Sequence, residues 1–173
     1  LTIGRMVARD SLGRDLWGVR LTEEGGRMTG AHPGTLSLLS SGHCLVAGVG
    51  SRFIVFDISR DEPVELWRES FSDGDHRPVF LMAQRGKLGV YRLTDGNGQS
   101  IGSLDLVTSE YVVFRKRSTL FVRRLADGRT VWQRSSVPSE ATVLGDDRRL
   151  LLLEPGHQNG EVIDLYDGHP VAT

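Results

Sequence analysis

The chain has 173 residues, of which 39% are hydrophobic and 25% charged, a composition typical of folded globular domains. Its formal net charge of -1 excludes the strongly basic field of a dedicated nucleic-acid-binding protein. The single cysteine, Cys44, excludes an intrachain disulfide and a cysteine-rich zinc site. No apolar stretch approaches the roughly 20 residues that span a bilayer, so we expect no transmembrane segment.

Glycine is frequent, with 21 residues, and proline is scarce, with 6, which favours short strands joined by tight turns. Residues 1–21 (GRMVARDSLGRDLWGVRL and its flanks) predict two strands around an Asp/Gly turn. Residues 22–35 show no strand pattern and indicate a surface loop. Residues 35–71 predict a complete meander of four strands, which ends in Leu66-Trp67.

Three further segments repeat this pattern of strands and Asp/Gly turns: 78–107, 110–136 and 141–173. The units recur at roughly the period of 40–45 residues that is typical of β-propeller blades. The sequence therefore predicts an all-β chain, a single propeller domain or propeller fragment over 1–173, with four antiparallel strands per blade. It holds about four and a half blades and is expected to be part of a larger propeller.

The segment Arg9 to Trp17, with the pattern Asp-x-x-Gly-x-x-Leu-Trp, resembles the PQQ-like repeat of quinoprotein-type propellers. The segment Leu125 to Trp132 matches this pattern nearly as well. WD-repeat propellers share the architecture and are the second possibility, although the chain contains no Trp-Asp dipeptide. The resemblance implies structural blade positions at the following residues: Trp17, Trp67, Trp132, Asp127, Gly128, Asp167 and Gly168.

A quinoprotein dehydrogenase would bind PQQ and calcium and would carry a disulfide between adjacent cysteines, which the lone Cys44 cannot form. The five histidines of this chain are not spaced as metal-ligand pairs: His32, His43, His76, His157 and His169. Residues 73–76 and 95–98 faintly resemble calcium loops, but Leu106 stands where a bidentate Glu would close an EF-hand. We therefore predict no cofactor, no metal site and no catalytic residues.

The only concentration of cations is a basic run formed by Arg115, Lys116 and Arg117, with Arg123 expected nearby. Such a run can bind a polyanion, nucleic acid or an acidic partner. More often such residues keep an exposed blade surface soluble and protect a sheet edge, and we favour this interpretation. Both interpretations stay open at the level of the sequence.

The sequence favours a non-catalytic scaffold that presents loop surfaces to a protein partner. The candidate loops are Thr22–Thr35, Phe71–Pro78 and Pro155–Gly160. The alternatives are part of a PQQ-dependent dehydrogenase whose catalytic blades lie elsewhere, and a polyanion binder. The remaining blades, or a second copy of the chain, are expected to cover the open sheet edges. The family resemblance alone implies an extracytoplasmic bacterial protein.

Overall fold

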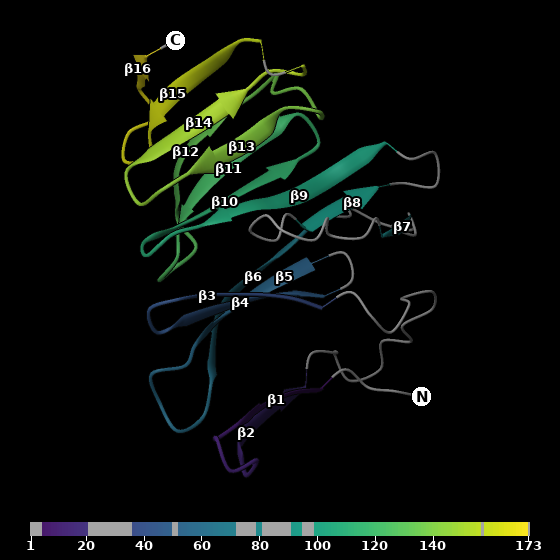
Figure 1. Ribbon diagram of the computed structural model, residues 1–173, viewed down its shortest axis with the longest axis vertical. Coiled ribbons are helices and arrows are strands. Elements are labelled where there is room, and N and C mark those ends of the chain that lie inside the picture. The colour runs from purple at the N-terminus through teal and green to yellow at the C-terminus, as the bar shows by residue number, and fades with distance from the viewer. Residues whose placement is uncertain are drawn as a thin grey trace.

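The computed structural model describes residues 5–20, 36–49, 52–71, 79–80, 91–94, 99–156 and 158–172. Within these residues the regular secondary structure is β-strand, and strands that follow one another within a sheet pair antiparallel. The strands form four sheets, which we call A to D in chain order. Figure 1 shows the sheets stacked along the longest axis, with sheet A at the N-terminal end and sheet D at the C-terminal end.

Sheet A is a hairpin, sheets B and D are meanders of four strands, and sheet C has six strands. The strands of sheets A and B are β1 (Arg5–Arg9), β2 (Asp15–Arg20), β3 (Leu36–Ser41), β4 (Cys44–Val49), β5 (Arg52–Asp57) and β6 (Val64–Ser70). Those of sheet C are β7 (Val79–Phe80), β8 (Tyr91–Thr94), β9 (Ser100–Val107), β10 (Tyr111–Lys116), β11 (Thr119–Arg124) and β12 (Thr130–Arg134). Those of sheet D are β13 (Thr142–Gly145), β14 (Arg149–Leu153), β15 (Gly160–Asp164) and β16 (Pro170–Ala172).

Sheet C differs from the sequence expectation, because residues 78–107 and 110–136 share one sheet instead of forming two. The reason is β9, which pairs with β8 along one edge and with β10 along the other. A tight turn joins β9 to β10: the Thr108 hydroxyl oxygen accepts a hydrogen bond of 2.9 Å from the Tyr111 amide, and the Thr108 amide donates one of 2.9 Å to the Tyr111 carbonyl. Strands β9 to β12 therefore form the meander that matches sheets B and D.

Three apolar cores lie between successive sheets, and strand alternation supplies them. Val112 and Phe114 of β10 project towards sheet B, while Val113 of the same strand projects towards sheet D. Sheet C is thus apolar on both faces, as expected of a sheet packed between two others. Met6 of β1 joins the smaller core between sheets A and B.

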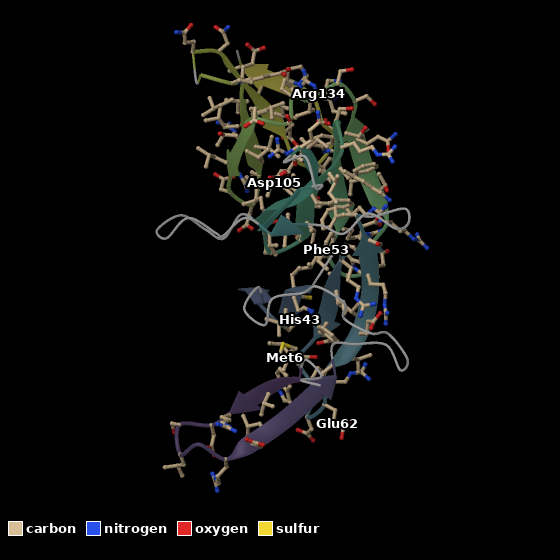
Figure 2. All side chains as sticks on the ribbon, turned by 90° about the vertical axis from the view of Figure 1, so that its right-hand side faces the viewer. Met6, His43, Phe53, Glu62, Asp105 and Arg134 are labelled. Carbon is tan, nitrogen blue, oxygen red and sulfur yellow. The ribbon has the colours of Figure 1, made fainter. Side chains whose placement is uncertain are left out.

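The core between sheets B and C is built around Phe53, which has no exposed surface. Its ring lies 5.4 Å from that of Trp67, 5.6 Å from that of Phe71 and 5.2 Å from that of Phe114, measured between centroids. Figure 2 shows Phe53 inside the stack, where the two sheets meet. Tilted and edge-on aromatic contacts of this kind add to the stabilisation that apolar burial provides.

Replacing Phe53 with alanine is expected to lower the free energy of unfolding by about 3–5 kcal/mol, because it removes a fully buried ring from a close-packed core. Chemical denaturation measures the change. The control is Leu12→Ala at a side chain that is 76% exposed, for which we expect a change within about 0.5 kcal/mol. Similar losses in the two variants would contradict the assigned core.

Candidate functional site

Two tryptophans that the sequence identified as structural each contact the next sheet in the chain. The Trp67 indole of β6 donates a hydrogen bond of 2.7 Å to the Leu125 carbonyl, in the turn after β11. The Trp132 indole of β12 donates one of 2.8 Å to the Leu165 carbonyl, in the turn after β15. Sheets B and C therefore each anchor their last strand to a turn of the following sheet.

Both turns need glycine for two reasons. Gly128 and Gly168 have φ angles of +70° and +76°, which side chains with a Cβ rarely adopt. A Cβ on Gly128 would also lie 2.8 Å from the Trp67 ring, and one on Gly168 would lie 2.9 Å from the Trp132 ring. Close approach of the indole to the turn backbone is thus possible only because these positions carry no side chain.

The aspartates that precede these glycines hold the turns in shape. Asp127 accepts a hydrogen bond of 3.1 Å from the Arg129 amide, and Asp167 accepts one of 2.9 Å from the His169 amide. Trp17, the remaining tryptophan, is partly buried and packs against the core between sheets A and B. The corresponding connection of sheet B joins β5 to β6. Its fourth residue is Asp61, whereas the fourth residue after β11 and after β15 is glycine.

Arg115 lies inside the protein, which corrects its placement in a surface patch. The residue is only 3% exposed, and its guanidinium forms a double hydrogen bond of 2.8 and 2.9 Å with the Asp105 carboxylate. One of its terminal nitrogens also donates to three backbone carbonyls, those of Pro138, Ser139 and Ala141, at 2.8–3.2 Å. Figure 2 shows Asp105 within the stack. The sequence-based prediction was wrong because it treated this face of β10 as exposed. The connection from sheet C to sheet D covers that face.

The other members of the basic run are divided between two environments. Arg123 and Lys116 face sheet B, where both pair with the Glu69 carboxylate, at 2.6 and 3.7 Å. The Arg123 guanidinium carbon also lies 5.2 Å from the centre of the Phe114 ring, a cation-π distance. Arg117 is exposed in the β10–β11 turn. The run therefore splits into one internal cation, two cations beside a carboxylate and one exposed cation.

Replacing Asp105 with alanine is expected to lower the free energy of unfolding by about 3–5 kcal/mol, because the Arg115 charge then stays buried without its counter-ion. The control is Asp15→Ala, which breaks an exposed pair with Arg9 and should cost about 0–1 kcal/mol. Thermal or urea unfolding checks both values. An Asp105 variant as stable as the parent would show that the Arg115 charge is accessible to water.

The connections within and between sheets C and D emerge on two opposite sides, because successive antiparallel strands run in opposite directions. One side, which we call the turn side, carries the tight turns at 108–110, 125–129, 146–148 and 165–169. The other, the loop side, carries the connections β10–β11, β12–β13 and β14–β15. In Figure 1 the turn side of sheets C and D lies on the left.

In the turn at 146–148, two carboxylates accept hydrogen bonds from backbone amides, which lowers their pKa values. Hydrogen bonds from the amides of Arg148 and Arg149 lower the pKa of Asp146. Hydrogen bonds from the amide and hydroxyl of Ser109 lower the pKa of Asp147 and join the turns of sheets C and D. The same bonding within a turn lowers the pKa of Asp10, in the hairpin of sheet A.

Stability is expected to fall as the pH drops below about 4, because these aspartates have lower pKa values in the folded chain than in the unfolded chain. Their ionised form favours the folded state, and protonation removes that contribution. Unfolding midpoints measured between pH 6 and pH 2 should show a shallower decline for Asp146→Asn than for Glu62→Gln, an exposed control between β5 and β6. Identical declines would contradict this origin of the acid sensitivity.

The loop side carries a cleft of about 810 Å³ between sheets C and D. Its walls are the connections β12–β13 and β14–β15, together with the ends of the strands that they join. The lining residues are Arg134, Ser136, Val137, Pro138, Ala141, Leu152, Glu154, Gln158, Asn159, Gly160 and Glu161. One of the loops that the sequence singled out, Pro155–Gly160, thus contributes to the cleft.

The cleft has an apolar floor and a charged rim. Val137 and Ala141 are buried, and they belong to the core shared by sheets C and D. At the rim, Arg134 of β12 forms an ion pair with Glu161 of β15 across the boundary between the sheets. Glu154 and Asn159 are exposed and hydrogen-bonded to each other, with 3.3 Å between the amide nitrogen and the carboxylate oxygen. The arrangement offers donors and acceptors of both charges around an apolar centre.

Several residues that the sequence singled out lie outside the described residues. They are Thr22–Thr35 and 72–78, the segment 95–98, and the histidines His32, His76 and His157. Phe71 is described and buried. His43 and His169 are exposed on turns. Their positions give no support to a histidine cluster.

Two searches of the described residues bear on metals and membranes. Among these residues, no group of three or more His, Cys, Asp and Glu side chains is arranged to hold a metal ion. The described part of the chain also contains no helix that is long and apolar enough to cross a membrane. Cys44 is buried in sheet B, and burial raises the pKa of its thiol, which disfavours the thiolate form.

No protein-family model matches the sequence, and no curated protein matches it. The structure resembles that of BamB from Moraxella catarrhalis, with a TM-score of 0.51 and 18% sequence identity. The match covers 92% of this chain and 39% of the BamB chain. The fold is all-β, with four-stranded antiparallel sheets that resemble the blades of the BamB propeller, which confirms the expected fold class. The chain spans about two-fifths of the length of the BamB chain.

A second solved structure, KlHsv2 with loop 6CD replaced by a Gly-Ser linker, matches with 9% identity and a TM-score of 0.27. That match covers 78% of this chain and 50% of the other. The score is too low to support a shared arrangement of the strands.

Proposed function

We propose that the chain is a non-catalytic propeller scaffold that binds a protein partner on its loop side, across the cleft between sheets C and D. The observation that carries this proposal is the cleft itself, which two irregular connections form on a framework of packed sheets. Binding surfaces on loops held by a rigid framework are common in propellers and other β folds. The resemblance to BamB supports the framework and leaves the partner open.

The chemistry of the cleft fits a peptide or protein surface better than a polyanion. Arg134 already pairs with Glu161, and Glu154 adds a second carboxylate at the rim. The exposed Gln158 and Asn159 side chains can donate to peptide carbonyls and accept from peptide amides. An apolar centre with a polar rim is the usual anatomy of a protein interface.

The lining residues give no support to catalysis. Those among the described residues include Ser136 and neither histidine nor cysteine, so none of them pairs this serine with an imidazole or a thiolate. The polyanion alternative is weakened by the burial of Arg115 and by the position of Glu69 beside Arg123 and Lys116. No observation among the described residues favours a PQQ-dependent dehydrogenase.

Site-specific photo-crosslinking tests the proposal in cells that produce the protein. A photoreactive amino acid at position 158, on the cleft, is expected to give a discrete crosslinked protein product that mass spectrometry can identify. The same group at position 166, a 75% exposed site on the turn side, is the matched control and should not give that product. Absence of any product at 158, or the same products at both positions, would contradict a partner at the cleft.

Replacing Asn159 with arginine should weaken the binding of the crosslinked partner by about tenfold or more, as expected when a contact worth over about 1 kcal/mol is lost. Titration of the purified partner measures the change. Tyr166→Arg, at a 75% exposed side chain on the turn side, adds the same single positive charge and is the control. Reduction of a dye that depends on added PQQ and calcium would instead support the dehydrogenase alternative.

A further inference from the structure

The cleft between sheets C and D has two chemically different walls. The β12–β13 connection contributes Val137, Pro138 and Ala141, whose side chains are apolar. The carbonyls of Pro138 and Ala141 are already engaged, because both accept hydrogen bonds from the Arg115 guanidinium, at 3.1 and 2.8 Å. This wall therefore offers a ligand apolar surface and few hydrogen-bond acceptors.

The opposite wall is polar and carries the acceptors. The β14–β15 connection contributes Glu154, Gln158 and Asn159, all of them exposed. The Asn159 side-chain amide donates a hydrogen bond of 3.3 Å to one oxygen of the Glu154 carboxylate. Among the described residues the other oxygen has no donor, and the Gln158 amide oxygen is a further acceptor. The donor groups of a ligand are therefore best satisfied on this side of the cleft.

The charges that line the cleft do not balance. The described lining residues include one cation, Arg134, and two carboxylates, Glu154 and Glu161. Arg134 forms an ion pair with Glu161, and no cation in the described part of the chain forms one with Glu154. In Figure 2 the label of Arg134 marks this part of the stack. The charge of Glu154 is thus the one that a bound partner can neutralise.

We propose that the cleft receives an arginine side chain of the partner, an inference that rests on the proposed protein-binding function. Arginine combines an aliphatic stem with a planar, permanently charged guanidinium. The stem lies against the apolar wall at Val137 and Pro138. The guanidinium donates to the Glu154 carboxylate and to the Gln158 amide oxygen, and charge-assisted hydrogen bonds of this kind are the stronger ones. An acidic side chain in the same place would be repelled by Glu154.

Two short peptides test this inference. The probes are acetyl-Ala-Arg-Ala-amide and acetyl-Ala-citrulline-Ala-amide, because citrulline keeps the length and planarity of arginine without its charge. Each is titrated into the 173-residue chain labelled with nitrogen-15, and the side-chain amide resonances of Gln158 and Asn159 report binding in the cleft. The dissociation constant of the arginine peptide is expected to be about threefold lower, the difference that an ion pair open to solvent provides.

Substitution of Glu154 locates the effect of charge. In Glu154→Gln the two peptides should bind equally, because the carboxylate that distinguishes them is gone. Glu62→Gln is the matched control, since it removes the same charge at an exposed site between β5 and β6, and it should keep the preference for arginine. The backbone amide spectrum confirms that each variant keeps the fold of the parent.

Two results would overturn the inference. One is equal binding of the two peptides to the parent chain, including no binding of either. The other is a preference for arginine that persists unchanged in Glu154→Gln. Either result, together with a discrete crosslinked product at position 158, rejects the arginine and leaves the proposed function in place. A preference for arginine without any crosslinked product would support the chemistry of the cleft and contradict the proposed partner.

Discussion

The contact between a tryptophan ring and the backbone of a glycine turn is the constraint on which the stack depends. At Trp67 and Gly128, and again at Trp132 and Gly168, it joins the last strand of one sheet to the next sheet. Apolar burial holds the faces of the sheets together but has no preferred direction. The indole hydrogen bond adds the direction, because its donor and acceptor each have one position in the repeat.

This contact explains which parts of the structure could be predicted from the sequence. Trp67 and Trp132 were identified as structural because each stands near the end of its repeat, in a Leu-Trp or a Val-Trp pair, and local chemistry is enough to predict the Asp/Gly turn that precedes Trp132. The division of residues 78–136 was harder to predict. Strand β9 is buried on both faces, and its sequence fits equally well as the end of one repeat or the start of the next.

The candidate site was harder to predict from the sequence than the turns were. Arg115 belongs to a run of cations that resembles a surface patch, and only the tertiary structure shows that residues 138–141 cover it. The cleft was predictable in part: the length of Pro155–Gly160 marks it as a loop, but the opposite wall, β12–β13, has no distinctive composition. A site formed between sheets depends on how neighbouring repeats are spaced, which sequence patterns within one repeat do not encode.

The position of Arg115 has a consequence for how this surface can change during evolution. Its guanidinium binds the carbonyls of Pro138, Ser139 and Ala141, which are present whatever side chains those positions carry. The path of the loop is thus largely uncoupled from its exposed side chains at positions 138 and 139. Mutations there can change the chemistry of the cleft surface while the wall of the cleft stays in place, so the same framework can carry different loop surfaces with little loss of stability.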